Sequence, residues 1–299
     1  MITLTTDFGT RDGYVAAMKG VMLLIHPDAR LVDVTHEINP QDVMEAAFVL
    51  RTTTPFFPPG TVHLVVVDPG VGTDRRAVAV RSGDQWFVGP DNGVFPLVLD
   101  DKEPDEIRVL DEPSAWRSDA PSTTFHGRDI FAPVAAHLDA GHSPANIGAL
   151  VEDLQPLRWA MPITDNHSVQ GYVAHVDRFG NCITNIRRKT LVRTGMDDAP
   201  ALKHTEASPG SPSSESGRAD PDAAEPNISD LPALKAYVGN AVIENLHRTY
   251  GAVADGDPLL LFGSSGFLEV AVNAGSAAEL LNIRKGDSIK VVFQREVAG

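Results

Sequence analysis

Cysteine, long apolar runs and basic residues are all scarce in this chain of 299 residues. The single cysteine, Cys182, cannot form a disulfide within the chain, and its count excludes zinc sites built from paired cysteines. The longest apolar runs, near residues 21–25 and 64–67, are far shorter than the roughly 20 residues that a membrane helix needs. The first residues lack a basic start followed by an apolar stretch, so we expect no secretory signal, no membrane partner and a cytoplasmic location.

The shortage of positive charge restricts the choice of partners. Lys and Arg number 25 against 40 Asp and Glu, which gives a formal net charge of −15. A nucleic-acid surface needs clustered Lys and Arg to replace counterions, so nucleic acid is not expected as a partner. An acidic balance is compatible with a cationic small substrate but does not identify one.

The first half of the chain alternates β-rich runs with amphipathic stretches, which predicts an α/β fold with a largely parallel sheet. The predicted elements lie at residues 2–7, 14–24, 30–35, 43–50 and 62–68, followed by a hairpin around residues 82–84 and a helix from about 128 to 138. We assign residues 1–157 to this N-terminal α/β domain.

The second half changes to β segments separated by turn residues, which predicts a smaller all-β, barrel-like domain at 170–299 after a linker at 158–169. The predicted strands lie at residues 171–176, 182–186, 240–245, 258–262, 267–272 and 288–293. Residues 197–230 contain eight acidic and two basic residues and are dense in Pro, Ser, Gly and Ala. We interpret them as an acidic, low-complexity surface insertion without a catalytic role.

Polar and glycine residues gather where predicted strands end, at residues 6–9, 67–72, 89–93 and 125–129. Asp7 and Asp68 each follow an apolar strand, and the carboxyl ends of strands in an open parallel sheet form the ligand crevice. Asp7 could accept hydrogen bonds from two ribose hydroxyls, because an ionised carboxylate only accepts. The competing interpretation of both aspartates is an ordinary turn or cap.

Arg75 and His126 are candidates for handling water beside Asp68. Histidine exchanges a proton near neutral pH, and Arg75 could supply a fixed charge. A solvated Arg75-Arg76 pair and a merely hydrogen-bonded histidine are the structural alternatives. No helical His-Glu-x-x-His spacing accompanies these side chains, so no metal is expected.

Two clusters in the second half have the chemistry of a ligand site. Asp177, Phe179 and Asn181 combine an aromatic face with short polar groups, which suits adenine. Ser264, Ser265 and Glu269 could bind an amino-acid end through hydroxyl and carboxylate groups. Taken alone, each cluster could equally be a turn.

The order and spacing of these motifs resemble one family, the S-adenosyl-L-methionine hydroxide adenosyltransferases, which are hydrolytic relatives of the fluorinases and chlorinases. The resemblance runs over nearly the whole chain outside the insertion. The motifs that carry it are TDFG at 6–9, KG at 19–20, NPQD at 39–42, DPGVG at 68–72, GPDNG at 89–93, FHGRD at 125–129, and the segments 177–185 and 264–273.

The resemblance implies hydrolysis of S-adenosyl-L-methionine to adenosine and L-methionine, with no cofactor. It implies that Asp68, Arg75 and His126 activate the water. It also implies a homotrimer whose sites lie between the N-domain of one subunit and the C-domain of its neighbour. The substrate contacts that it implies, besides Asp68, are Asp7, Phe8, Gln41, Phe125, Asp177, Phe179, Asn181, Tyr250, Ser264, Ser265, Glu269 and Ala274.

Two residues distinguish the hydrolytic branch from its relatives. In the halogenases a tyrosine stands in the place of Asp68 and a serine in the place of Gly127, and the fluorinases carry an extra loop after the strand that matches residues 77–81. This chain has neither replacement and no such loop. A halide-dependent adenosyltransferase and a binding protein without turnover are the alternative hypotheses.

Overall fold

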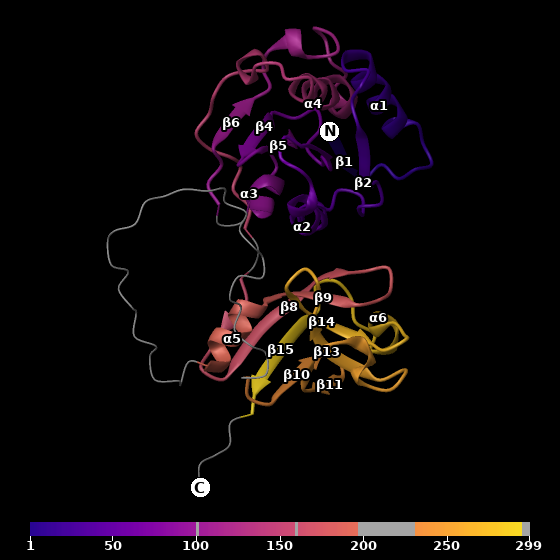
Figure 1. The fold of residues 1–299 in the computed structure, drawn as a ribbon, viewed down its shortest axis with the longest axis vertical. Helices are drawn as coiled ribbons and strands as arrows, with labels where there is room; N and C mark the ends of the chain where they lie inside the picture. The colour runs from indigo at the N-terminus through magenta and orange to yellow at the C-terminus, as the bar shows by residue number, and fades with distance from the viewer. Residues whose placement is uncertain (100–101, 159–160, 197–230, 295–299) are drawn as a thin grey trace, which may run out of the picture. The chain divides into compact units, whose positions relative to one another are not determined.

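The structure is a computed structural model that describes residues 1–99, 102–158, 161–196 and 231–294. The chain divides into two compact units, Met1–Trp159 and Ala160–Gly299 (Figure 1). Each unit has its own sheet and its own hydrophobic core. The acidic insertion predicted at residues 197–230 lies outside the described residues.

The sheet of the first unit has six strands in the order β2-β1-β3-β5-β4-β6. Parallel pairs join β1 to β2, β1 to β3, and β3 to β5, whereas β4 runs against both of its neighbours. The strands are β1 Ile2–Thr6, β2 Leu31–Thr35, β3 Val62–Val66, β4 Ala77–Ser82, β5 Gln85–Pro90 and β6 Glu106–Val109. The predicted α/β fold with a largely parallel sheet is therefore confirmed.

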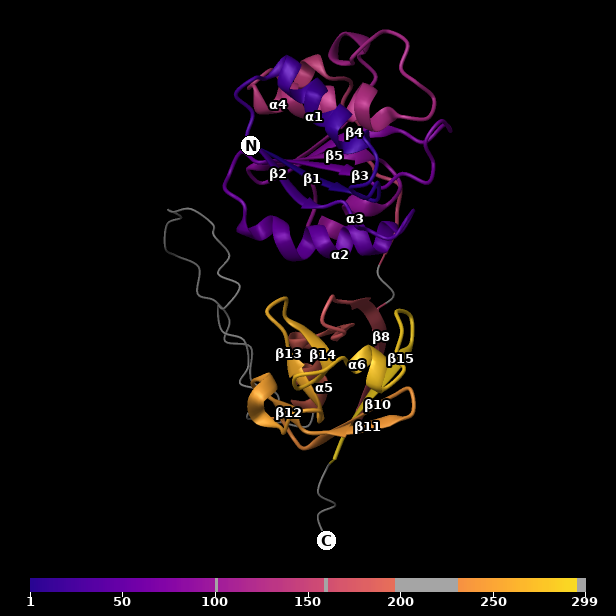
Figure 2. The same cartoon turned by 90° about the vertical axis from the view of Figure 1, so that its right-hand side faces the viewer.

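Helices cover both faces of this sheet (Figure 2). On one face lie α1 (Tyr14–Ile25) and α4 (Ala132–Asp139), and on the other lie α2 (Val43–Thr53) and α3 (Val94–Leu99). Short turns of 3₁₀ helix occur at η1 Thr54–Phe56, η2 Pro113–Ala115 and η4 Pro144–Asn146. No helix in the described part of the chain is both long and apolar enough to cross a membrane.

The central strand β3 shows why the two layers form. Val62, Leu64 and Val66 pack into the core beneath α1 and α4. Val65 belongs to the core beneath α2 and α3. Successive side chains of a strand point to opposite faces, so a strand that is buried on both faces is largely apolar, and His63 is the one polar residue of β3.

The second unit contains a nearly closed, barrel-like sheet in the order β11-β10-β15-β8-β9-β14-β13-β12, with β7 paired to β8 and β11 lying beside β13. The predicted β-barrel-like fold is confirmed. The elements are β7 Ile163–Thr164, β8 Ser168–Val176, β9 Cys182–Arg187, α5 Arg188–Met196, β10 Leu234–Val238, β11 Ala241–Glu244, β12 Leu246–His247, η6 Tyr250–Ala252, β13 Pro258–Phe262, β14 Phe267–Val272, α6 Ala277–Leu280 and β15 Ser288–Phe293.

Several local features differ from the sequence-based expectations. The helix expected from about residue 128 begins as a π-helix, η3 (Gly127–Phe131), before α4. Within the range expected to be a linker, β7 pairs antiparallel with β8, with Ile163 opposite Gln170. The strand β10 and the helix α5 were not expected, because short apolar runs show too little periodicity to be assigned from sequence.

A buried histidine lies in the middle of the N-terminal sheet. His63 on β3 is fully buried, its Nδ1 lies 2.7 Å from Thr3 Oγ1, and its ring stacks on Phe87 with the centroids 5.0 Å apart. Burial lowers the pKa of His63 to about 4, so the ring is neutral at neutral pH.

This burial predicts an acid-dependent loss of stability. Below pH 6.5 the unfolded chain takes up a proton on His63 that the folded chain does not take up until about pH 4. The free energy of unfolding should therefore fall by on the order of 3 kcal/mol more in the wild type than in His63→Phe as pH falls from neutral to about 4. Urea unfolding over this pH range measures the difference, and parallel curves for the two proteins would contradict it.

Candidate active site

The carboxyl ends of β1 and β3 bring two carboxylates to one edge of the N-terminal sheet. The strands are parallel neighbours, and Thr6 pairs with Val66. Asp7 follows β1 directly, and Asp68 lies shortly after the end of β3. Since ligands of open α/β sheets bind outside the carboxyl ends of the strands, this edge is the candidate site of the first unit.

Arg75 joins Asp68 to His126. Its Nε donates to Asp68 Oδ1 at 2.9 Å, and its Nη2 forms an ion pair with the other carboxylate oxygen. The same Nη2 lies 2.9 Å from His126 Nδ1. The side chains of Arg75 and Asp68 are only 9% and 6% exposed, so water screens this arrangement weakly. The structure thus brings the three predicted water-activating residues into direct contact.

This contact determines the protonation of His126. A guanidinium group only donates, so Nδ1 must accept and the neutral ring carries its proton on Nε2. Burial and the charge of Arg75 lower the pKa of His126, while the charges of Asp68 and Asp129 raise it in part. A protonated ring would also turn an N–H toward the N–H of Arg75. His126 is therefore a neutral ring with an Nε2–H donor at neutral pH.

A glycine-rich loop turns the chain so that Arg75 reaches back to Asp68. A Cβ at Gly70 would lie 3.1 Å from Arg75 Cγ. Gly72 has φ +77°, and a Cβ there would lie 2.5 Å from the carbonyl oxygen of Thr123. This close approach packs the loop against the segment that leads into His126, so the two segments that supply the site hold each other in place.

Asp7 is held by the backbone of a strained turn. Its Oδ2 accepts the N–H of Gln41 at 2.7 Å. Gln41 has φ 67°, a left-handed conformation that is uncommon outside glycine and costs energy. A carboxylate has about four lone-pair sites, so Asp7 can accept hydroxyl donors from a ligand as well.

Three aromatic rings lie beside these polar groups. Phe8 and Phe125 meet edge to face with centroids 5.7 Å apart, and Tyr14 lies 5.5 and 5.3 Å from them. Tyr14 is half exposed at the start of α1 and was not among the residues expected at the site. Only the exposure of its ring distinguishes it from a core residue, and exposure cannot be read from the sequence.

In the second unit Asp177 organises the turn between β8 and β9. Its Oδ1 accepts the backbone N–H groups of Phe179 and Asn181, and its Oδ2 accepts Asn181 Nδ2, each at 2.9 Å. The turn leaves the ring of Phe179 76% exposed. The alternative interpretation of a turn is therefore correct for Asp177, and this turn leaves the aromatic face of Phe179 exposed.

Glu269 and Tyr250 form a second polar group in this unit. The Tyr250 hydroxyl donates to Glu269 Oε2 at 3.1 Å, and Glu269 is almost fully buried. Burial, and then the nearby Asp177, raise the pKa of Glu269. Burial and Glu269 raise the pKa of Tyr250 to about 12. A buried carboxylate of this kind is stabilised by a cation such as an ammonium group.

The other predicted residues of the second unit lie around the β13–β14 turn and after β14. A Cβ at Gly263 would lie 1.6 Å from Glu269 Oε1, so the carboxylate is pressed against the start of this turn. Ser265 Oγ is buried and has no hydrogen-bond partner in the described structure. Ser264 and Ala274 are exposed, and Ala274 has φ 53°. Within the described ranges, no group of three or more His, Cys, Asp and Glu side chains could hold a metal ion.

Comparison with known proteins identifies the family. Residues 2–148 match the SAM hydroxide adenosyltransferase N-terminal domain, and residues 226–290 match the C-terminal domain. The chain belongs to the SAM hydroxide adenosyltransferase family. The family expected from the sequence motifs is thereby confirmed.

Several named proteins are similar to the chain over nearly their full length. A protein of Thermus thermophilus named (R)-S-adenosyl-L-methionine hydrolase is 38% identical over 96% of this chain and 97% of its own length. A protein of the same name from Methanocaldococcus jannaschii is 31% identical over 98% of this chain and 96% of its own length. A fluorinase of Actinopolyspora mzabensis is 28% identical over 97% of this chain and 96% of its own length.

A solved structure is similar to the chain over nearly its whole length. The crystal structure of an uncharacterized conserved protein from Thermotoga maritima superposes with a TM-score of 0.82 and is 36% identical, and the match covers 98% of this chain and 100% of that one. The structural match therefore extends through both units.

The contact between Arg75 and His126 predicts a measurable titration. By NMR, the pKa of His126 should lie below 6.5 in the wild type. In Arg75→Met the pKa of His126 should rise, because the variant removes both the positive charge that disfavours a protonated ring and the N–H that donates to Nδ1. Arg76→Met is the matched control, since Arg76 pairs instead with Asp91 and Asp153. Equal pKa values in the wild type and Arg75→Met would contradict the proposed protonation.

Proposed function

We propose that this protein hydrolyses S-adenosyl-L-methionine to adenosine and L-methionine, with Asp68, Arg75 and His126 activating the attacking water. The observation that carries the proposal is the buried contact of Arg75 with both Asp68 and His126. Support also comes from the full-length relatives named (R)-S-adenosyl-L-methionine hydrolase, which are 31–38% identical to this chain.

In this reaction the sulfonium is already a good leaving group, whereas water is a weak nucleophile. Water oxygen forms a bond to C5′ while the C5′–S bond breaks, and the electron pair neutralises the sulfonium to a thioether. The attacking water gives up one proton to solvent water as the C5′–O bond forms, so that the products are neutral adenosine 5′-hydroxyl and methionine thioether. Free water has a pKa of about 15.7, so hydroxide is scarce at neutral pH and the protein must stabilise negative charge on the attacking oxygen.

Two donors with fixed orientations serve this purpose. The Nε2–H of His126 and the guanidinium of Arg75 stabilise charge that develops on the water oxygen. Asp68 accepts two N–H groups of Arg75 and so holds the guanidinium in a single orientation. As a neutral ring protonated on Nε2, His126 acts here as a donor rather than as the base that removes the proton from water.

The substrate contacts follow from the chemistry of the remaining groups. Asp7 accepts the ribose hydroxyls, and the rings of Phe8 and Phe125 cover apolar parts of the substrate near C5′. The positive charge on sulfur disappears in the transition state. A carboxylate beside the sulfur would therefore stabilise the ground state more than the transition state, whereas apolar contacts do not. The strained Gln41 backbone orients Asp7.

In the second unit, Phe179 and Asn181 contact adenine, and Asp177 orders their turn. Glu269 and Tyr250 receive the methionine ammonium group, while Ser264 and Ser265 donate to its carboxylate. Ala274 contacts the same end of the substrate. The unpaired hydroxyl of Ser265 and the raised pKa of Glu269 support this assignment.

We further propose a homotrimer in the cytoplasm that needs no cofactor, because the sulfonium is already an activated leaving group. The buried, unpaired Cys182 fits a reducing compartment. The water-activating set lies in one unit and the methionine-binding set in the other. Sites between neighbouring subunits would combine them.

Isotope labelling tests the reaction. Purified protein is incubated with S-adenosyl-L-methionine in halide-free buffer made with oxygen-18 water, and the nucleoside is analysed by mass spectrometry. We expect adenosine labelled at the 5′ oxygen. A product that forms only with added chloride or fluoride would indicate a halide-dependent transferase, and bound but unchanged substrate would indicate a binding protein.

Substitution of the donors should lower turnover more than binding. Arg75→Met and His126→Ala should each reduce kcat by roughly 10²–10³, the usual effect of losing one preorganised donor, with smaller changes in KM. Asp68→Asn should act through Arg75 and fall in the same range. Arg76→Met is the control for loss of an adjacent arginine. Near-normal kcat in all three site variants would exclude the mechanism.

Subunit mixing tests the interface sites. Asp68→Ala and Glu269→Ala, each expected to be nearly inactive, are co-expressed with different tags and the mixed oligomer is isolated. Sites shared between neighbouring subunits would return about a third of wild-type activity, because a mixed trimer of either composition has one interface in three that joins an intact N-domain to an intact C-domain. Sites within single subunits would return none.

A further inference from the structure

We propose that Asp129 is a positioning residue that clamps the segment 117–124 against η3 and thereby holds His126 and Arg75 in their reactive geometry. The inference rests on the proposed function, because it concerns the same water-activating set. In this assignment Asp129 does not touch substrate, and it acts through the chain segments around it and through its charge on His126.

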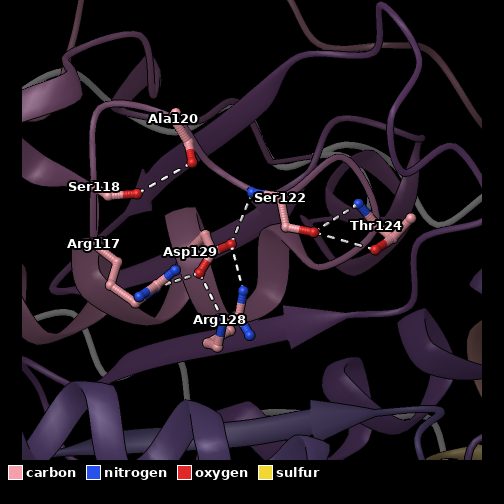
Figure 3. Close-up of polar contacts among 7 residues, drawn as sticks. All are labelled: Arg117, Ser118, Ala120, Ser122, Thr124, Arg128 and Asp129. Carbon is pink, nitrogen blue, oxygen red and sulfur yellow. Dashed lines mark hydrogen bonds and ion pairs between the residues drawn. The ribbon is translucent and has the colours of Figure 1, made fainter.

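The carboxylate of Asp129 is completely buried and receives hydrogen bonds from three residues (Figure 3). Oδ1 accepts Arg117 Nε at 2.5 Å and Arg128 Nε at 2.7 Å. Oδ2 accepts Arg128 Nη2 at 2.8 Å and the backbone N–H of Ser122 at 2.9 Å. Burial alone would raise the pKa of Asp129, but hydrogen bonds from Arg128, Ser122 and Arg117 lower this pKa well below the usual value.

The backbone of Asp129 takes part in the same clamp. Its carbonyl oxygen accepts the N–H of Arg117 at 2.9 Å. In a regular α-helix this carbonyl would accept the N–H of residue 133, but Pro133 has none to donate. Asp129 therefore binds Arg117 through both its backbone carbonyl and its carboxylate. It also accepts the backbone N–H of Ser122, so both ends of the loop from Arg117 to Ser122 are attached to Asp129.

The clamped loop bears directly on the catalytic geometry. Immediately after Ser122, the carbonyl of Thr123 packs against Gly72 in the loop between Asp68 and Arg75. The side chain of Thr124 contacts Ser122 Oγ at 3.2 Å, and Phe125 and His126 follow. Arg128 also lies over the Phe125 ring at 5.1 Å. One buried carboxylate thus joins the segment that bears His126 to the loop that positions Arg75.

Stability alone does not account for such an arrangement. The carboxylate is fully buried, whereas the side chains of Arg117 and Arg128 are 44% and 32% exposed, and the desolvation of the carboxylate offsets much of what these pairs add to stability. We attribute the arrangement to the geometry that it fixes. The charged groups around His126 are Arg75 and Asp68 from one segment and Asp129 from η3. Removing the Asp129 charge should therefore loosen the loop and change the titration of His126.

Asp129→Asn is the main test, because it keeps the shape of the side chain and removes its charge. We expect kcat to fall about 10–100-fold with little change in KM, since small displacements of catalytic groups lower turnover on this scale. The acidic limb of the kcat–pH profile should move to lower pH, because the variant loses a charge that raises the pKa of His126.

Two further variants separate positioning from folding. Arg117→Gln removes one arm of the clamp from a side chain that is 44% exposed, and it should give a smaller loss of kcat without unfolding the protein. Asp139→Asn is the matched control: this carboxylate at the far end of α4 is 5% exposed and pairs with the N-terminal ammonium group and His26. It should leave kcat and the pH profile unchanged.

Unchanged kcat and an unchanged acidic limb in Arg117→Gln and in folded Asp129→Asn would overturn the proposal. So would an equal loss in Asp139→Asn. If Asp129→Asn does not fold, Arg117→Gln decides the matter. If the wild type makes no adenosine, the NMR titration of His126 in Arg117→Gln still tests the clamp, because Arg117 is not among the charges that act on His126 directly. A changed His126 pKa in that variant supports the clamp, and an identical pKa rejects it.

Discussion

The contact between the Arg75 guanidinium and the imidazole of His126 is the constraint on which the site depends. Because arginine only donates, the contact assigns the histidine proton to Nε2, keeps the ring neutral and turns a potential base into a donor. Asp68 balances the arginine charge and fixes its plane. Charge, tautomer and orientation therefore follow from one buried cation.

The fold supplies this contact through the ends of parallel strands and the turns that follow them. The edge shared by β1 and β3 holds Asp7 and Asp68. Gly72 lets the loop after Asp68 touch the segment before His126, although more than 50 residues separate them in sequence. The site is thus built from backbone conformations that depend on glycine and on a strained Gln41, with the charged groups added to them.

Much of this could be predicted from the sequence. Alternating apolar segments gave the layered α/β unit and the barrel-like unit, and motif order gave the family. Asp68, Arg75 and His126 were predicted and lie in contact. Their protonation could not be predicted, because it depends on which atom of Arg75 faces which ring nitrogen. Tyr14 and Asp129 were missed for a similar reason: exposure and burial, which distinguish them, follow from tertiary packing rather than local pattern.

The π-helix at the start of α4 has an evolutionary consequence. A π-turn is an α-helix turn with one residue inserted. In a regular helix the direction of His126 and the face that α4 packs against the sheet would be fixed relative to each other, and the inserted residue in η3 separates them. The packing of α4 against the sheet depends on the residues after the insertion, whereas the direction of His126 depends on those before it. Deleting one residue from η3 would leave the core face of α4 in register and rotate His126 by about 100° around the helix axis. The direction of His126 and the core of this unit can thus change independently during divergence.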